Sequence, residues 1–311
     1  MDDKEYRIIR VAELYFKQGY SQQSIANILG ISRTTVSRLI NESKNKGIVK
    51  IYINTPYTID YNLSTKIKEK FQLKDALVVN IEDEDETITL SQVGTVAASF
   101  VMALLKNGMV VGISFGKHIK HVVDAMPENE LENIEVVQLV GALGSGDSNV
   151  DGPVLAIKLA NTLHAKYKYI NSPAVVSDEN IKKALLEQPQ IKQTFSLINQ
   201  CNIAIHGIGS LDEENSSMQR SGYIDEQQRE KYAKAGAVGH VLGHMIDIDG
   251  NIIKEQDYHT IGAPLDLLKN LEWSIGVATN SIKYKAVIAA INGGYVNCLI
   301  INRLLANKLL Q

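Results

Sequence analysis

The sequence predicts an α/β protein of two domains, a small helix-turn-helix domain of the winged type and a larger domain with a mostly parallel sheet. Three observations predict this organisation. Two short amphipathic segments flank Gly30, apolar strand-like runs alternate with helical runs after residue 62, and 311 residues are too many for one average domain. We expect the small domain to cover residues 1–53, a linker to cover 54–62, and the large domain to cover 63–311.

The composition is typical of a globular protein and excludes the disordered and fibrous classes. Hydrophobic residues make up 45% of the chain and charged residues 22%. The longest weakly polar run, residues 93–105, contains glycine, threonine and serine and is too short to span a bilayer. Cys201 and Cys298 lie in apolar strand-like runs, which fits reduced packing residues. We therefore expect a cytoplasmic protein without a membrane partner.

The charges are distributed unevenly along the chain. Residues 1–53 carry nine Lys or Arg against five Asp or Glu, a surplus of +4, so the remainder must carry −7 to give the net charge of −3. A basic N-terminal part on an acidic body indicates that the N-terminal part meets a polyanion. The alternative is ordinary surface charge.

The basic N-terminal part has the periodicity of three helices. Apolar residues recur at spacings of three and four over residues 4–18, which predicts an amphipathic helix that ends near Gly19. Ser21 and Ser32 are good N-caps for two further helices, and Gly30 allows the chain to reverse between them. The side chains predicted to face inward from these two helices are Ile25, Ala26, Ile28, Leu29, Val36, Leu39 and Ile40.

The outward side of the second and third helices has the chemistry of a DNA-reading surface. Arginine can bond the acceptor edge of guanine in a bidentate way, and threonine or serine can bond phosphates. The alternative is a helical hairpin whose polar face meets only water. A strand-like run over Ile48–Ile53 predicts a basic wing. The residues predicted to contact double-stranded DNA are Gln22, Gln23, Ser32, Arg33, Thr34, Thr35, Ser37, Arg38 and Asn41.

The larger domain alternates apolar runs with helical segments. Strands that are apolar on both faces and separated by helices predict a mostly parallel sheet with helices on both sides. In such sheets, ligands bind beyond the carboxyl ends of the strands. The predicted strands are residues 76–81, 109–114, 135–141, 174–177, 202–209, 274–279 and 296–302.

Polar residues and glycines follow several of these strands and predict a pocket for a polar small molecule. Backbone N–H groups at a helix start, together with a hydroxyl and an ammonium group, can bind an anion or sugar hydroxyls. The glycines at 141, 144 and 146 do not have the spacing of a dinucleotide fingerprint. The predicted pocket residues are Ser114, Phe115, Gly116, Lys117, His118, Gly141, Gly144, Asp178, Gly207, Gly209, His240 and Lys283.

The chain resembles the SorC family of sugar-responsive bacterial transcriptional regulators. The resemblance covers nearly the whole sequence and rests on the helix-turn-helix segment and on several motifs that occur in the family's order. The motifs are "GISFGKHI" (112–119), "SPAVVSDENI" (172–181), "IAIHGIGS" (203–210), "AGAVGHVLGHMIDIDGNI" (235–252) and "SIGVATNSIKYKAVIAAINGGYVNCLIINR" (274–303).

This resemblance implies a DNA-binding N-terminal domain and an effector-binding C-terminal domain that also carries the oligomer contacts. The C-terminal domain of the family is similar in fold to glucosamine-6-phosphate deaminase and ribose-5-phosphate isomerase, and its effector is usually a phosphorylated sugar. Three positions depart from the family pattern. Lys117 and His118 stand where a hydroxyl residue is common, Val140 replaces a lysine that forms an imine in some members, and His240 replaces an acidic residue.

The sequence therefore predicts a transcriptional regulator of a carbohydrate operon. The expected partners are operator DNA, a sugar, polyol or sugar phosphate, and further copies of the chain in a dimer or tetramer. We expect no cofactor, no catalytic residue and no metal site, although His240 and His244 have a spacing that metal ligands on a helix would share. Two alternatives stay open: an isomerase-like enzyme that uses Asp178, Glu179 or His240, and a DNA-binding scaffold without an effector.

Overall fold

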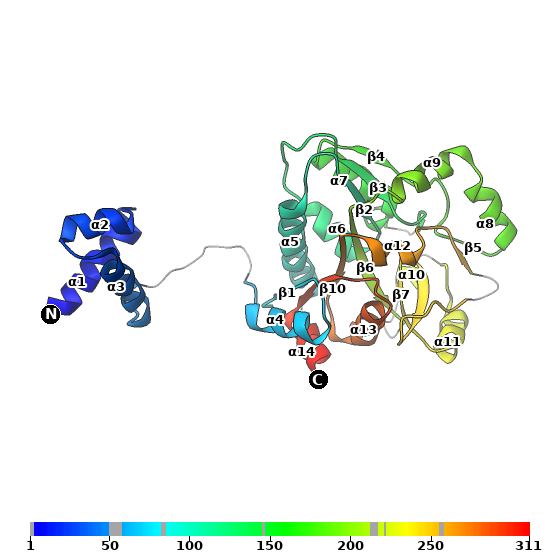
Figure 1. Ribbon diagram of the computed structural model, residues 1–311. Helices are drawn as coiled ribbons and strands as arrows, with labels where there is room; N and C mark the ends of the chain where they lie inside the picture. The colour runs from blue at the N-terminus through cyan, green and yellow to red at the C-terminus, as the bar shows by residue number, and fades with distance from the viewer. Residues whose placement is uncertain are drawn as a thin grey trace. The chain divides into compact units, whose positions relative to one another are not determined.

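The computed structural model describes residues 3–49, 58–81, 85–144, 147–211, 217–220, 222–254 and 258–311. It divides into two compact units, Met1–Thr55 and Pro56–Gln311, and Figure 1 labels most of their elements.

The smaller unit is a bundle of short helices. The predicted first helix is present as α1 (Asp3–Ala12) followed by the π-helical turn η1 (Glu13–Lys17), and α2 (Gln22–Leu29) and α3 (Arg33–Asn45) follow it. Their apolar stripes meet in one core, as the periodicity predicted. The buried residues of this core are Ile8, Val11, Leu14, Ile25, Ala26, Val36, Leu39 and Ile40.

Two details of the smaller unit differ from the prediction. Ile28, predicted to face inward, is 53% exposed on α2, whereas Ile25 and Ala26 of the same helix are buried in the core. Ile48 and Val49, predicted to begin the strand of a wing, lie in a bend after α3. The rest of the predicted wing, residues 50–53, lies outside the described residues.

The larger unit contains the predicted parallel sheet (Figure 1). Neighbouring strands along its main path are parallel, with registers such as Ile205 opposite Ile275. In spatial order the strands are β1 (Asp75–Val79), β11 (Cys298–Asn302), β10 (Trp273–Ala278), β6 (Ile203–Ser210), β2 (Val110–Ile113), β3 (Glu135–Gln138) and β4 (Lys166–Lys168).

Helices cover both faces of this sheet, which explains why its central strands are mostly apolar. On one face α5 (Glu86–Leu104), α6 (Lys117–Asp124) and α7 (Gly152–Thr162) pack on Ile203 and Ile205. The opposite face packs on Ala204 and Ile208. The helices that contribute to this second core are α4 (Tyr61–Lys70), α9 (Pro189–Ile198), α12 (Leu265–Asn270), α13 (Tyr284–Asn292) and α14 (Arg303–Leu310).

Helix α5 is long and apolar enough to cross a membrane by length and composition, the one such helix among the described residues. It packs in the core of the larger unit through Val93, Ala97 and Val101. A Cβ at Gly94 would lie 2.6 Å from the backbone of His121, so α5 and α6 are in close contact. These contacts are those of a core helix.

The predicted strand 174–177 does not belong to the main sheet. Only Val175–Val176 is extended, as β5, and it pairs antiparallel with β9 (His259–Thr260) in a separate two-stranded sheet. The prediction was wrong here because a short apolar run has no period that reveals its partner. Residues 58–62, expected in the linker, already belong to the larger unit, since Ile59 pairs with Val79 and α4 begins at Tyr61.

A hairpin extends the sheet beyond β6. Strand β7 (Ala237–Val241) pairs antiparallel with β6, and β8 (His244–Asp247) pairs antiparallel with β7. A third hydrophobic core lies at this end of the sheet, with α11 (Glu226–Lys234) and the short α10 (Ser217–Arg220) beside it. Helix α8 (Glu179–Leu186) lies next to β5 and β9.

Candidate functional site

The turn between α2 and α3 is fixed by local hydrogen bonds, as the sequence predicted. Ser21 Oγ accepts from Ser24 N at 3.1 Å, and Ser32 Oγ accepts from Thr35 N at 3.1 Å. Gly30 adopts φ 66° and ψ 31°, a left-handed conformation that favours glycine. The two helices are therefore held at a defined angle by residues within the motif.

The outward face of α3 presents the predicted polar side chains. Arg33, Thr34, Arg38 and Asn41 are exposed, whereas Thr35 and Ser37 are partly buried. Neither arginine forms an ion pair with any other described residue. This leaves two cationic forks on one side of the helix, in the geometry that suits guanine edges and phosphates.

Other predicted contact residues already have partners within the motif. The Ser32 hydroxyl lies 2.7 Å from Thr34 Oγ1 and 2.8 Å from Thr35 Oγ1, in addition to its capping bond. Gln23 Nε2 donates to Asn27 Oδ1 at 3.3 Å, and Gln22 is partly buried. Their first role is to order the helix starts.

The acidic residue of α3 is neutralised. Glu42 forms ion pairs with Lys4 on α1 at 2.9 Å and with Lys46 at 3.5 Å. The hydrogen bond from Lys4 lowers the pKa of Glu42. Since the first turn of α3 contains no acidic residue, the exposed face of this helix is positive.

In the larger unit, the carboxyl ends of β2, β6 and β10 bring together part of the predicted pocket. Gly207 N on β6 donates to Ser114 Oγ, which follows β2, at 3.3 Å. The nearest atom to a Cβ at Gly207 would be Phe115 O at 3.9 Å, so a methyl group fits at this position of β6. His118 on α6 reaches Thr279, which follows β10.

His118 is a neutral acceptor. Its Nε2 accepts from Thr279 N at 3.0 Å and lies 2.9 Å from Thr279 Oγ1. Burial and then the nearby Lys283 ammonium lower the pKa of His118 well below its usual value. Lys283, only 6% exposed, thus brings a buried cation to the end of β10.

His240 lies near the same cation. Burial and then Lys283 lower the pKa of His240 to about 4. Its ring faces Phe115 with a centroid separation of 6.5 Å and an interplanar angle of 24°. Both ring nitrogens are buried without a hydrogen-bond partner among the described residues. A Cβ at Gly209 would lie 2.0 Å from His240 Nε2, so the glycine makes room for the ring.

The other predicted pocket residues have structural roles. Asp178 caps α8 by accepting from Asn180 N at 2.6 Å and from Ile181 N at 3.3 Å. It was predicted at the end of a main-sheet strand, but β5 lies in the separate two-stranded sheet. Lys117 pairs with Glu86 at 3.2 Å on the surface, away from the buried cluster.

The predicted loop glycines are also explained by packing and turns. A Cβ at Gly141 would lie 2.4 Å from Pro173 O, and Gly116 has φ 101° at the start of α6. Gly144 N donates to Asp151 Oδ2 at 3.0 Å. The same carboxylate also accepts from Leu143 N and caps α7. The sequence analysis did not predict this role of Asp151, although an aspartate just before a helix that begins Gly-Pro is a typical N-cap.

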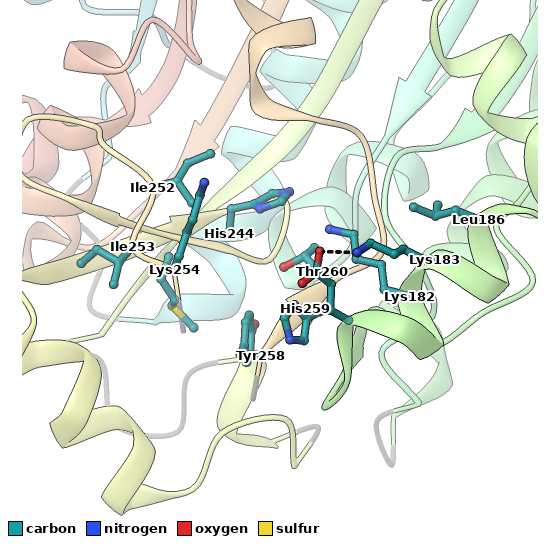
Figure 2. Close-up of a pocket in the computed structure, with 12 residues that line it drawn as sticks. Lys182, Lys183, Leu186, His244, Ile252, Ile253, Lys254, Tyr258, His259 and Thr260 are labelled. Carbon is teal, nitrogen blue, oxygen red and sulfur yellow. Dashed lines mark ion pairs between the residues drawn. The ribbon is translucent and has the colours of Figure 1, made fainter. Parts of the chain in front are cut away.

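The structure also contains a cavity of about 630 Å³ beside α8 that the sequence did not predict (Figure 2). It is lined by segments that are far apart in the chain, so no single motif marks it. Its lining residues are Glu179, Lys182, Lys183, Leu186, His244, Met245, Ile252, Ile253, Lys254, Tyr258, His259 and Thr260.

His240 and His244 do not lie on a helix. His240 pairs with Met245 and Val241 pairs with His244 across the β7–β8 hairpin. Since neighbouring residues on a strand point to opposite faces and paired residues share a face, the two histidines lie on opposite faces. Within the described part of the chain, no group of three or more His, Cys, Asp or Glu is arranged to hold a metal ion.

Comparison with known proteins covers both units. The family described as "Putative sugar-binding domain" matches residues 55–311, and the family described as "Sigma-70, region 4" matches residues 2–46. The second match confirms the helix-turn-helix character of the smaller unit, whose α2 and α3 lie within it.

Two curated relatives are regulators that match over nearly their whole length. The sorbitol operon regulator of Klebsiella pneumoniae is 30% identical over 307 residues, which covers 98% of this chain and 97% of the relative. The deoxyribonucleoside regulator of Bacillus subtilis is 30% identical over 310 residues, with 99% and 98% covered. The crystal structure of the full-length sorbitol operon regulator SorC from Klebsiella pneumoniae has a TM-score of 0.76 at 29% identity and covers both chains completely.

Proposed function

The chain belongs to the SorC family of bacterial transcriptional regulators, and we propose that its α3 reads operator DNA while the cluster around Lys283 binds the effector. It is a DNA-binding regulator of a carbohydrate operon whose activity is controlled by a sugar-type effector. The observation that carries this conclusion is the full-length match to regulators by a chain that has both an exposed helix-turn-helix face and a sugar-binding domain.

The chemistry of α3 supports direct contact with the DNA. Arg33 and Arg38 are exposed, and each can bond a guanine edge or a phosphate. Asn41, one helical turn after Arg38, can bond the edge of adenine. The capped start of α3 gives these side chains a fixed register, because Ser32 orders its first turn.

The cluster in the larger unit supports a polar effector without fixing its identity. Lys283 supplies a buried cation. The rings of His118 and His240 near it are neutral, because burial lowers their pKa values, so they can offer hydrogen bonds but no positive charge. The Ser114 hydroxyl, which accepts from Gly207 N, lies at the same edge of the sheet. We propose that a sugar, polyol or sugar phosphate binds there, with the Lys283 ammonium as a donor to phosphate or hydroxyl oxygens.

The arrangement of carboxylates supports a protein that is not an enzyme. Of the candidates for a general base, Asp178 caps α8 by accepting from two backbone N–H groups, and Glu179 forms an ion pair with Lys183. The third candidate, His240, is a weak base, because burial lowers its pKa to about 4. The relatives named above are regulators, which supports the same conclusion.

We further propose that the chain forms a cytoplasmic homo-oligomer, a dimer or tetramer. An oligomer pairs two DNA-reading helices, and an effector that prefers one arrangement of the pair changes the spacing of these helices. The affinity for the operator then changes, because the half-sites of DNA lie at a fixed separation. The proposed division of labour is DNA binding by residues 1–53 and effector binding by the larger unit, which already includes residues 58–62 of the linker predicted over 54–62. Sedimentation of the full-length chain at several concentrations tests the assembly, and a monomer at all of them contradicts it.

The DNA-binding proposal is tested by fluorescence anisotropy with promoter fragments from the chain's own operon. Arg38→Ala is expected to weaken operator binding by about 1–3 kcal/mol, either for one base position or for all sequences alike. Arg10→Ala on α1, an exposed arginine outside the proposed face, is the matched control. Unchanged affinity of the Arg38 variant contradicts the assignment of α3.

The effector proposal is tested by a thermal-shift screen against sugars, polyols and their phosphates, since a ligand that binds only the folded state raises the melting temperature. Lys283→Gln is expected to abolish the response and to keep operator binding. Lys285→Gln, which changes an exposed lysine two residues further on, is expected to behave as the wild type. Catalytic conversion of a hexose derivative by a chain that ignores promoter DNA would contradict the whole proposal.

A further inference from the structure

The described lining of the cavity beside α8 does not include Lys283, His118 or His240. It is formed by α8, by β8 and the residues that follow it, and by Tyr258 and β9 (Figure 2). Its His244 lies on the face of the β7–β8 hairpin opposite His240. A ligand in this cavity would therefore contact different side chains from those proposed for the effector.

The lining of the cavity is positively charged. It contains three ammonium groups, those of Lys182, Lys183 and Lys254, against one carboxylate, that of Glu179. Glu179 is 3.0 Å from Lys183, the ion pair drawn as a dashed line in Figure 2. Lys182 is half-buried, and this burial lowers its pKa. The surplus of cations matches a phosphate group better than a neutral or cationic ligand.

His244 adds a buried acceptor to these donors. Its Nε2 has no hydrogen-bond partner among the described residues. Burial and then Lys182 lower the pKa of His244 to about 4, while a hydrogen bond with the backbone of Ala263 acts in the opposite sense. A hydrogen bond that raises the pKa of a histidine is one in which a ring N–H donates to a carbonyl oxygen. Since Nε2 has no partner, the donor to Ala263 is Nδ1, and Nδ1 carries the proton of the neutral ring. Nε2 then carries a lone pair.

Figure 2 shows Lys182 extending from α8 in the direction of the His244 ring. The nearest hydroxyls on this wall are already used, since Tyr258 OH and Thr260 Oγ1 both donate to Gly243 O, at 3.0 and 3.1 Å. Among the described side chains on this wall, His244 Nε2 is a buried acceptor without a hydrogen-bond partner. A buried polar atom without a partner costs free energy that a ligand donor recovers.

The remaining wall is apolar. Leu186, Met245, Ile252 and Ile253 line the cavity, and Ile252 is 40% exposed. A carbon skeleton fits such a wall, whereas inorganic phosphate alone leaves it uncovered. The three features together describe a ligand that has an anionic end, a hydroxyl group and carbon atoms.

We propose that this cavity is a second ligand site, for a small phosphorylated polyhydroxy compound. Lys182 and Lys254 bind its phosphate, His244 Nε2 accepts a hydrogen bond from one of its hydroxyls, and Ile252 contacts its carbon skeleton. The proposal goes beyond the effector cluster and does not depend on Lys283.

Calorimetric titration of the full-length chain carrying Lys283→Gln tests the proposal with the effector cluster impaired. The probes are glucose 6-phosphate, inorganic phosphate and glucose. We expect glucose 6-phosphate to bind most tightly, inorganic phosphate more weakly and glucose weakest. Binding of none of the three, or equal binding of glucose and glucose 6-phosphate, overturns the proposal and leaves the DNA and effector assignments untouched.

Variants in the same background assign the contacts. Lys182→Gln and Lys254→Gln are each expected to weaken glucose 6-phosphate by about tenfold or more, the value of a charge-assisted hydrogen bond. Lys192→Gln on α9, which changes a surface lysine paired with Glu187, is the matched control. His244→Leu should weaken glucose 6-phosphate but not inorganic phosphate, and His244→Gln, which keeps an acceptor, should restore part of the loss. Wild-type affinity in both lysine variants, with retained operator binding as proof of folding, refutes the site.

Discussion

Lowering the pH from 7 to 5 is expected to destabilise the larger unit, because it buries several histidines in the neutral form. Burial lowers the pKa of His206, His240 and His244 to about 4 in each case. An unfolded chain returns them to their ordinary value of about 6.5. Between these two values the unfolded state binds more protons than the folded state, so stability falls as the pH falls.

The size of the effect follows from the two pKa values. Each histidine that titrates near 4 when folded and near 6.5 when unfolded removes about 2 kcal/mol of stability between pH 7 and 5. Three such groups remove about 5 to 6 kcal/mol, a large part of the roughly 5 to 15 kcal/mol that stabilises a typical domain. The loss begins below about pH 6.5, before carboxylates of ordinary pKa start to titrate.

His206 is the best single test of this reasoning, because it lies in the sheet and outside both proposed ligand sites. Its Nε2 is 3.1 Å from Ser274 Oγ and 3.2 Å from Tyr295 O, and its Nδ1 is buried without a partner among the described residues. Replacement by glutamine should reduce the loss between pH 7 and 5 by about 2 kcal/mol. His164→Asn, at an exposed position with φ 51° that asparagine tolerates, is the control and should leave the loss unchanged.

Urea unfolding followed by the fluorescence of Trp273 measures this quantity. Trp273 is the single tryptophan of the sequence and lies on β10, and all seven histidines also lie in the larger unit. The signal therefore reports the unit that carries the titrating groups. A change below about 1 kcal/mol between pH 7 and 5 would refute the buried neutral state of these rings, as would an identical pH dependence in the His206 variant.

Three further predictions concern local devices. Ser32→Ala removes the cap of α3 and should cost the smaller unit about 1 kcal/mol, measured by thermal unfolding of the full-length chain by circular dichroism; an unchanged curve argues against the cap. Asp151→Ala leaves three backbone N–H groups without their acceptor and should cost the larger unit about 1–3 kcal/mol, with Asp147→Ala as the control in the same urea assay. Gly209→Ala forces the His240 ring to move and should lower the free energy of unfolding by about 1–3 kcal/mol. Gly207→Ala places a methyl group where it fits and should be nearly neutral. Equal effects of the two variants would contradict the close contact between Gly209 and His240.

The smaller unit was predictable because its signals are local. Ser21, Gly30 and Ser32 act on backbone groups within five residues of themselves, so their types and spacing already contain the turn. The parallel strands were predictable for a related reason, since burial on both faces requires apolar runs. The prediction was wrong for Ile28. Ile28 and Leu29 are adjacent apolar residues, and the sequence alone does not say which of the two faces the core.

The β7–β8 hairpin was missed because its turn lacks the usual signal. Two-residue hairpin turns with positive φ at both positions favour Asn-Gly or Asp-Gly. Here the positions are Leu242 with φ 47° and Gly243 with φ 78°. Leucine rarely adopts this conformation, so the segment did not indicate a hairpin. Leu242 is 2% exposed, which suggests that burial of its side chain stabilises the strained turn.

The structure brings together part of the predicted pocket, and the division has a physical cause. Ser114, His118 and Lys283 follow strands of one parallel sheet and Gly207 lies on β6, so their meeting follows from topology. Asp178 lies elsewhere because the strand before it pairs with β9, a tertiary fact without a local signal. Thr279 was missed because a threonine after a strand has no special pattern, although it is the direct partner of His118.

The hairpin that the sequence concealed connects the two proposed ligand sites. Strand β7 is bonded to β6 through the pair of Gly209 and His240, and β8 carries His244 on the opposite face. A shift of β7 relative to β6 therefore moves both imidazoles together, since the hairpin's own backbone bonds hold its two strands in register. If the hairpin moves when a ligand binds, a ligand at the first site changes the affinity of the second site. The ligand at the second site then changes the affinity of the first site by the same factor. Two carbohydrate-type signals would then be combined in the larger unit before any change reaches the DNA-reading helix.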